Sequence, residues 1–151
     1  MEDELVLIAP PDFELGRISH AQLAASTLLL REQGSGSRHA VETAFAKARL
    51  KISSFKNVIK LDSTQAIKSA AEAGLGVGFV PACSIHKELE LRALKVVEVE
   101  GLRVSRDYFV VSLIGPAPSG AAGAFRSFAL ESARRFSTLT RKSARSADIL
   151  L

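Results

Sequence analysis

The chain has 151 residues, of which 47% are hydrophobic and 24% are charged. This composition is that of an ordinary folded domain, and it excludes a disordered chain, a collagen-like fibre and a disulfide scaffold. The formal net charge of +4 resides at the end of the sequence, because residues 1–133 hold 15 bases and 15 acids whereas five bases and one acid follow. A neutral body argues against a nucleic-acid surface, which is built from clustered bases.

The sequence predicts no membrane span and no leader. Its longest nearly apolar stretch, residues 73–83, has 11 residues and three glycines, whereas a spanning helix needs about 20 apolar residues. The N-terminus MEDELVLIAP carries acids where a signal peptide carries bases. We therefore expect a cytoplasmic protein.

Apolar runs and helical spacing predict the elements of the first half in turn. Residues 5–9 form a buried strand that Pro10 and Pro11 end, and residues 19–25 form a short helix capped by Ser19. A strand at 27–31, a turn at 33–37 and a helix at 38–49 follow. A strand at 57–61 leads through Asp62, a predicted helix cap, into a helix at 66–73 and a strand at 77–80. This alternation indicates an α/β fold with a parallel sheet flanked by helices.

The second half is predicted to add four more elements. They are a helix at 84–91, an edge strand at 95–99, a strongly apolar strand at 108–114 and a helix at 121–136. We expect residues 137–151 to form a frayed, solvated basic tail.

Two predicted helices begin at the carboxyl ends of strands, where open parallel sheets bind ligands. Free backbone N–H groups, the positive end of the helix dipole and small hydroxyl side chains suit a carboxylate, phosphate or sulfate there. The alternative, that the hydroxyl groups only cap their helices, stays open. The candidate binding residues are Gly34, Ser35, Gly36, Ser37, Ser63 and Thr64.

We expect no catalytic residues, no metal site and no cofactor. The three histidines have no ligand-spaced partner, no serine lies in a nucleophile elbow, and no Gly-Lys-Ser/Thr follows the glycine-rich turn. His39, in the first turn of the helix after Ser37, is the one titrating group that an enzyme could use at this site.

Four stretches together resemble the effector-binding domain of LysR-type transcriptional regulators. Residues 29–38 (LLREQGSGSR) are similar to a family segment that typically reads REPGSGTR, with Gln33 in place of proline and Ser37 in place of threonine. The others are residues 41–45 (VETAF), residues 61–68 with 71–81 (LDSTQAIK and AEAGLGVGFVP), and residues 108–111 (YFVV). Their order matches the family over most of the chain.

The resemblance implies a periplasmic-binding-protein-like fold of the second type, with an effector in a cleft between two lobes. Residues 2–136 would be a partial effector-binding domain, with 28–99 as the second lobe, 5–9 and 108–114 as hinge strands and 121–136 as the C-terminal helix. Effector contacts of the family map to Ser35, Ser37, Ser63 and Thr64. Since most of the first lobe has no counterpart here, the cleft has one wall and binding should be weak.

The implied function is that of a sensor module that binds a small anionic metabolite and so controls transcription, without enzymatic activity. The implied partners are that metabolite and a second copy, in a homodimer or higher oligomer formed through this domain. DNA would be contacted only through an N-terminal domain absent from this sequence. An enzyme, or a stand-alone solute-binding or dimerisation module of the same fold, is the alternative.

Overall fold

A computed structural model describes residues 2–111, 114–115 and 118–146, with side chains to residue 133 in the last range. The chain divides into two compact units. The first is Glu4–Arg106, and the second takes in Asp107 and the residues that follow it, together with the first residues of the chain. Within the part of the chain described, no helix is both long enough and apolar enough to cross a membrane.

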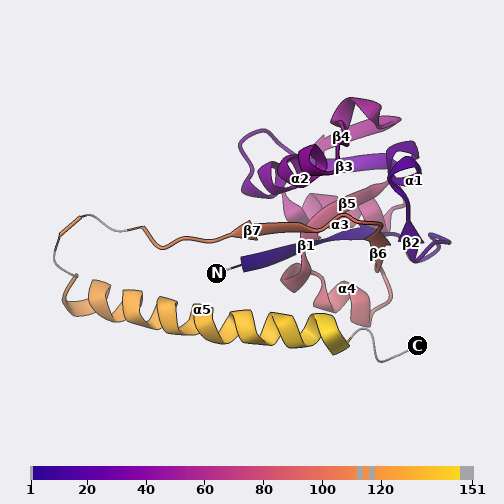
Figure 1. Ribbon diagram of the computed structural model, residues 1–151. Coiled ribbons are helices and arrows are strands. Elements are labelled where there is room, and N and C mark those ends of the chain that lie inside the picture. The colour runs from indigo at the N-terminus through magenta and orange to yellow at the C-terminus, as the bar shows by residue number, and fades with distance from the viewer. Residues whose placement is uncertain (1, 112–113, 116–117, 147–151) are drawn as a thin grey trace. The chain divides into compact units, whose positions relative to one another are not determined.

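The first unit is built on one mixed sheet with the strand order β2-β6-β1-β5-β3-β4 (Figure 1). Strand β3 pairs in parallel with both β4 and β5, which confirms the predicted parallel sheet there. Strand β1 pairs antiparallel with β5 and β6, and also pairs with β7. The strands are β1 (Glu2–Ala9), β2 (Arg17–Ile18), β3 (Thr27–Arg31), β4 (Asn57–Leu61), β5 (Val77–Pro81), β6 (Lys95–Val99) and β7 (Val104–Asp107). The predicted edge position of β6 is wrong, because short β2 lies outside it.

Three of the helices, α1, α2 and α3, begin where a serine hydroxyl accepts a backbone N–H of the first turn. Ser19 caps α1 in a full capping box with Gln22, as predicted. Ser35 caps α2, and Ser63 caps α3. The predicted cap at Asp62 is wrong by one residue, since the Ser63 hydroxyl accepts the Ala66 N–H at 3.1 Å. The helices are α1 (His20–Ala25), α2 (Gly36–Lys47), α3 (Thr64–Glu72) and α4 (His86–Glu90), with single 3-10 turns at Ile52–Ser54 and Ala82–Ser84.

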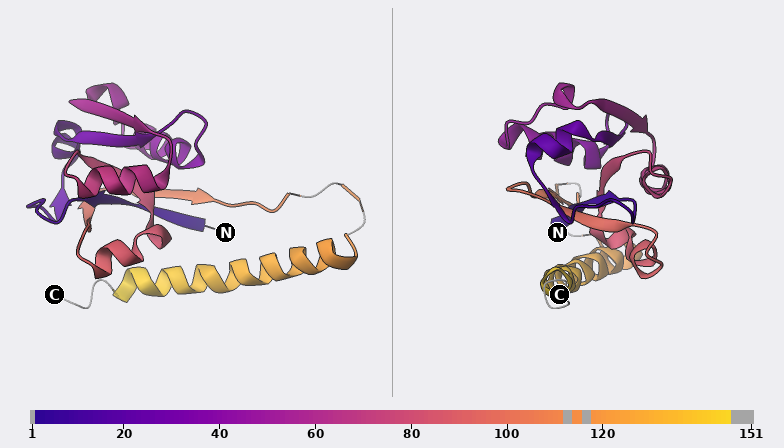
Figure 2. Two further views of the ribbon diagram at one scale, coloured as in Figure 1. Left: turned by 180° about the vertical axis from the view of Figure 1, so that it is seen from behind. Right: turned by 90° about the vertical axis from the view of Figure 1, so that its right-hand side faces the viewer.

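Helices α2 and α3 cover opposite faces of the sheet (Figure 2). The chain steps outward from β3 to β4 through α2 and then steps back past β3 to β5 through α3. Because both crossovers are right-handed by rule, the reversal of direction puts the two helices on opposite faces.

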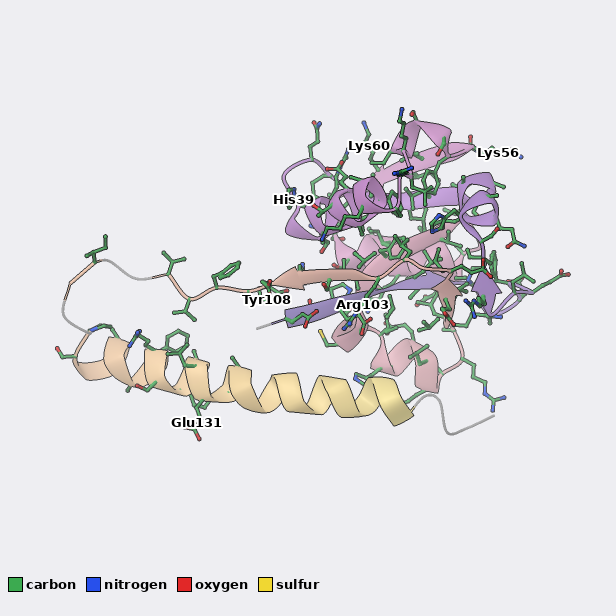
Figure 3. The ribbon with its side chains drawn as sticks, viewed as in Figure 1. His39, Lys56, Lys60, Arg103, Tyr108 and Glu131 are labelled. Atoms are coloured by element: carbon green, nitrogen blue, oxygen red, sulfur yellow. The ribbon has the colours of Figure 1, made fainter. Side chains whose placement is uncertain are left out.

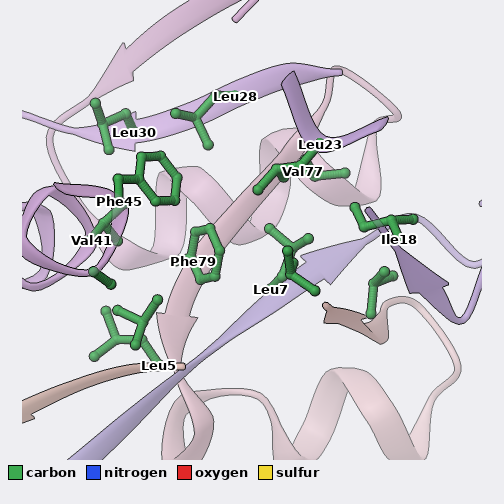
Figure 4. Packing of buried hydrophobic residues seen from close by; sticks show 14 of the residues in the cluster. Leu5, Leu7, Ile18, Leu23, Leu28, Leu30, Val41, Phe45, Val77 and Phe79 are labelled. Atoms are coloured by element: carbon green, nitrogen blue, oxygen red, sulfur yellow. The ribbon is translucent and has the colours of Figure 1, made fainter. Parts of the chain in front are cut away.

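Alternation along the strands divides the apolar side chains between two cores. On β1, Leu5 and Leu7 join the larger core under α2, whereas Ile8 joins the core under α3. Phe45 of α2 is buried in the larger core (Figure 4), with its ring 5.4 Å from that of Phe55 and 5.8 Å from that of Phe79. Strands β1, β3 and β5 are therefore largely buried on both faces, as their apolar sequences predict, whereas β4 is largely exposed.

Glycines permit close contact between α3 and the sheet. A Cβ atom at Gly78 would lie 2.7 Å from the Ile67 Cγ2 atom and 3.0 Å from the Leu29 carbonyl oxygen. Gly74 ends the α3 segment with a φ of +74°, the left-handed conformation predicted for a helix C-terminal glycine.

The second unit differs from the prediction in two places. The strand expected at 108–114 is wrong: β7 ends at Asp107, residues 108–111 have no strand structure, and residues 112–113 lie outside the described range. An apolar run becomes a strand only where it pairs with another strand, and none of the described strands pairs with residues 108–111.

The tail prediction also needs correction. Helix α5 (Gly120–Ser146) contains the expected helix at 121–136 and continues ten residues into the segment expected to fray. Those residues contain neither glycine nor proline, so nothing in them terminates a helix.

Candidate anion-binding site

The starts of α2 and α3 lie at one edge of the first unit. Arg31, the last residue of β3, pairs with Leu61, the last residue of β4, and the next N–H, that of Glu32, donates to the Leu61 carbonyl oxygen at 3.0 Å. Each helix begins a few residues beyond these neighbouring strand ends. The structure thus brings Ser35, Ser37, Ser63 and Thr64 to the same edge, as parallel pairing of the two strands requires.

The α2 start is shaped by a tight turn and a buried serine. Gly34 has a φ of +88°, which favours glycine because a side chain there would be strained. Ser35 caps the helix through a long 3.5 Å contact with the Arg38 N–H. Ser37 is only 4% exposed, and its hydroxyl oxygen accepts a hydrogen bond from the Arg106 guanidinium at 2.8 Å.

The α3 start carries a similar pair of hydroxyl groups. Ser63 is occupied as the helix cap, whereas Thr64, the first residue of the helix, accepts from the Arg31 guanidinium at 3.3 Å. This second contact joins the end of β3 to the start of α3. At both helix starts, therefore, one hydroxyl caps and the other contacts an arginine.

Arg31 is already partly neutralised by its neighbour. Its guanidinium makes two hydrogen bonds to the Glu32 carboxylate, at 2.7 and 2.9 Å. These bonds raise the pKa of Arg31 above its ordinary value and lower the pKa of Glu32 below its own, with coulombic attraction adding to both effects. Both groups stay charged near neutral pH, so an anion approaching Arg31 must compete with Glu32.

A third arginine, Arg38, makes contacts at the same edge. Arg38, in the first turn of α2, donates to the Arg31 carbonyl oxygen at 3.2 Å and forms an ion pair with Glu42 at 2.8 Å. Arg31, Arg38 and Arg106 thus all contact the strand ends or helix starts that carry the candidate residues. Sequence reasoning did not identify them: Arg31 and Arg38 flank the glycine-rich turn, but nothing local indicates Arg106, which lies 69 residues from Ser37.

The other sequence candidates are placed as follows. Gly34 and Gly36 lie at the surface of the α2 start, where they can offer backbone but no side chain. His39 is exposed on the first turn of α2 (Figure 3). Among the described residues, no group of three or more His, Cys, Asp or Glu side chains could hold a metal ion. Hydroxyl groups, guanidinium groups and helix N-termini together suit the binding of a small anion.

Comparison with known proteins shows which family this chain is similar to. The family model for the LysR substrate binding domain matches residues 1–134. A RuBisCO operon transcriptional regulator of Allochromatium vinosum is 40% identical over 138 residues, which are 89% of this chain and 45% of the relative. The transcriptional activator CmpR of Synechocystis is 35% identical over 115 residues, which are 74% of this chain and 36% of the relative. The chain spans less than half the length of these curated relatives.

Two solved structures resemble the fold. The regulatory domain of CcmR from Synechocystis in complex with 2-PG aligns with a TM-score of 0.66 at 25% identity, over 85% of this chain and 62% of that one. The effector-binding domain of QuiR in complex with shikimate also aligns with a TM-score of 0.66, at 17% identity, over 89% of this chain and 63% of that one. At that identity the second match establishes the fold alone.

Proposed function

Because the chain belongs to the LysR substrate-binding domain family, we propose that it is the effector-sensing part of a LysR-type transcriptional regulator of the cytoplasm. In this proposal it binds a small anionic metabolite at the starts of α2 and α3. Ligand binding would bias the arrangement of subunits in a homodimer or higher oligomer, and so the DNA-binding domains of the whole regulator.

One observation carries the proposal. The two helix N-termini open at neighbouring ends of parallel strands, and the Arg31–Thr64 hydrogen bond joins the end of β3 to the start of α3. A single capped helix start is ordinary, but two at one edge, each with a hydroxyl on a guanidinium, offer a small anion several donors at once.

We propose a ligand with a phosphate group, of the size of 2-phosphoglycolate (2-PG). The relative with a bound ligand at 25% identity holds 2-PG. A phosphate and a carboxylate on one small molecule are two anionic groups for two helix starts. Arg106, which reaches Ser37 from β7, brings a second guanidinium group to this edge beside that of Arg31.

The proposal is tested by thermal unfolding of this chain with 2-PG, shikimate and sulfate. The informative variant is Ser63→Asp, because aspartate caps a helix as well as serine does but adds a negative charge at the site. We expect 2-PG at ten times its Kd to stabilise the wild type by about 1.4 kcal/mol. The Ser63→Asp variant should keep its own stability and lose this response.

Ser19→Asp is the matched control, since it places the same charge at the cap of α1, a helix start outside the candidate site. It should respond to 2-PG as the wild type does. An equal response of Ser63→Asp and Ser19→Asp would contradict the site, and no response of the wild type at millimolar 2-PG would contradict the ligand class.

We also propose that the ligand is bound and released unchanged. Side chains at the two helix starts bind and orient an anion, and none of those described there forms a hydrogen-bonded nucleophile–base pair. Phosphorus NMR of 2-PG incubated with the protein should show one unaltered signal, whereas release of inorganic phosphate would indicate an enzyme. Light scattering should give the mass of at least two chains.

A further inference from the structure

The neutral net charge of residues 1–133 hides an uneven distribution of bases and acids along the chain. Residues 43–61 contain five bases and no acid, whereas the rest of residues 1–133 contains ten bases and fifteen acids. All five bases are exposed, and none forms an ion pair with a described residue. We call this set the basic edge: Lys47, Arg49, Lys51, Lys56 and Lys60.

The fold gathers these bases at one margin of the sheet. Strand β4 is the last strand of the order, so one of its sides has no neighbouring strand. Lys60 is two residues from Val58 and therefore shares its face of β4. Since Val58 packs against the larger core under α2, Lys60 is on the α2 side of the strand. Figure 3 shows Lys56 and Lys60 projecting at this margin. Lys47 ends α2, and Arg49 and Lys51 lie in the connection between α2 and β4.

Local roles account for part of this pattern only. A lysine on an outer strand discourages pairing with another sheet, and a lysine in the last turn of a helix complements the helix dipole. These roles explain Lys60 and Lys47. They do not explain Arg49, Lys51 and Lys56, nor the lack of any acid among the 19 residues that separate Glu42 from Asp62.

The dimensions of the basic edge fit a polyanion. Lys56 and Lys60 are four residues apart in extended chain, a separation of about 13 Å. Duplex DNA carries one negative charge for about every 1.7 Å of its axis, so a surface of this length faces several phosphates at once. Lysine contacts of this kind hold the backbone without reading the bases.

We propose that the basic edge contacts the phosphodiester backbone of duplex DNA. This contact is separate from the effector site and from any contact that a DNA-binding domain makes. It is independent of sequence, and in an assembled regulator it would hold DNA against the sensing domain. Five phosphate contacts predict that affinity for DNA falls by a few hundredfold between about 50 and 200 mM salt.

The test is fluorescence anisotropy of a labelled 20-base-pair duplex titrated with the full 151-residue chain at both salt concentrations. Replacing Lys56→Glu and Lys60→Glu together should weaken binding at low salt by tenfold or more. It should also reduce the slope of log affinity against log salt by about two, one unit for each lost phosphate contact.

The matched control is Lys87→Glu with Arg126→Glu, two exposed bases outside the basic edge that bring the same change in net charge. This control should bind DNA within about threefold of the wild type, and circular dichroism verifies that both variants are folded. Equal losses in the two double variants would overturn the proposal, because net charge alone would then govern binding. A change in oligomeric state without a change in DNA binding would overturn it in favour of a protein partner.

Discussion

Phe45 and Phe125 show how differently the two units use an apolar residue. Phe45, in the first unit, is 1% exposed and packs against two other phenylalanine rings, whereas Phe125, on α5 in the second unit, is 70% exposed. Both lie in helices with apolar residues at helical spacing. The difference is that α2 has a sheet to cover, while residues 108–110 and α5 line an open apolar hollow of about 410 Å³. Apolar periodicity thus predicts which face of a helix can be buried, and a partner surface decides whether it is.

The sharpest way to break this comparison is to truncate both side chains. Phe45→Ala removes a fully buried ring from the larger core, and substitutions of this kind cost about 3–5 kcal/mol. Phe125→Ala should change the free energy of unfolding by less than about 0.5 kcal/mol. Urea unfolding followed by circular dichroism measures both. A cost above 2 kcal/mol for Phe125→Ala would show that α5 is buried in solution.

Buried and exposed ion pairs provide the next contrast. Lys68 of α3 and Glu88 of α4 are both nearly buried, 2.7 Å apart, and Lys68 also donates to the Ser84 carbonyl oxygen at 2.9 Å. Lys68→Met should lower the free energy of unfolding by about 3 kcal/mol, because it leaves the buried Glu88 carboxylate without its cationic partner. Lys68→Met with Glu88→Leu should recover most of the loss. Arg17→Met, at an exposed pair with Glu98, should cost under about 1 kcal/mol.

The same pair predicts a dependence on pH. The hydrogen bond from Lys68 holds the pKa of Glu88 below its ordinary value of 4.5. A carboxyl group whose folded pKa is lowered stabilises the fold above its unfolded pKa, and this stabilisation is lost as the pH falls through the folded pKa. The double variant should therefore lose less stability than the wild type between neutral pH and acidic pH. Parallel acid curves for the two proteins would contradict the assignment.

A smaller effect is expected where the backbone of the sheet meets α3. Gly78→Ala would place a methyl group 2.7 Å from the Ile67 Cγ2 atom, and overpacking of this kind costs about 1–3 kcal/mol. Gly16→Ala is the matched control, because nothing lies within 4 Å of its added Cβ atom. The control should be neutral or slightly stabilising. A neutral Gly78→Ala would mean that α3 can move away from the sheet.

Local patterns predicted most of the first unit because its elements obey local rules. The strands at 27–31 and 57–61 occur as predicted, since apolar runs between turns have few alternatives. The prediction of a strand at 108–114 was wrong because pairing is a property of two segments, and none of the described strands pairs with residues 108–111. The cap predicted at Asp62 was wrong because Asp62 and Ser63 are adjacent residues of types that both cap helices, and in the structure α3 begins directly after Ser63.

The sequence was enough to predict where the two helix starts of the candidate site lie, but not which arginines contact them. Parallel pairing of two strands was enough to place both helix starts at one edge. The arginine contacts were not predictable, because Arg106 reaches Ser37 across 69 residues of sequence and Arg31 reaches Thr64 across 33. The sequence pattern predicts which strands pair, and therefore which helix starts are neighbours. The contacts of long side chains such as arginine depend on the tertiary structure and cannot be predicted from the pattern.

Two substitutions at Ser63 measure the contribution of its hydroxyl as the cap of α3. Ser63→Ala removes the hydroxyl that accepts the Ala66 N–H, and the loss of a cap costs about 1 kcal/mol. Ser63→Asp should restore that stability, because the aspartate accepts the same N–H and favours the helix dipole. Thermal unfolding without ligand measures both. If Ser63→Ala proves neutral, the hydroxyl does not stabilise α3 as a cap, and the capping contribution assigned to it would be contradicted.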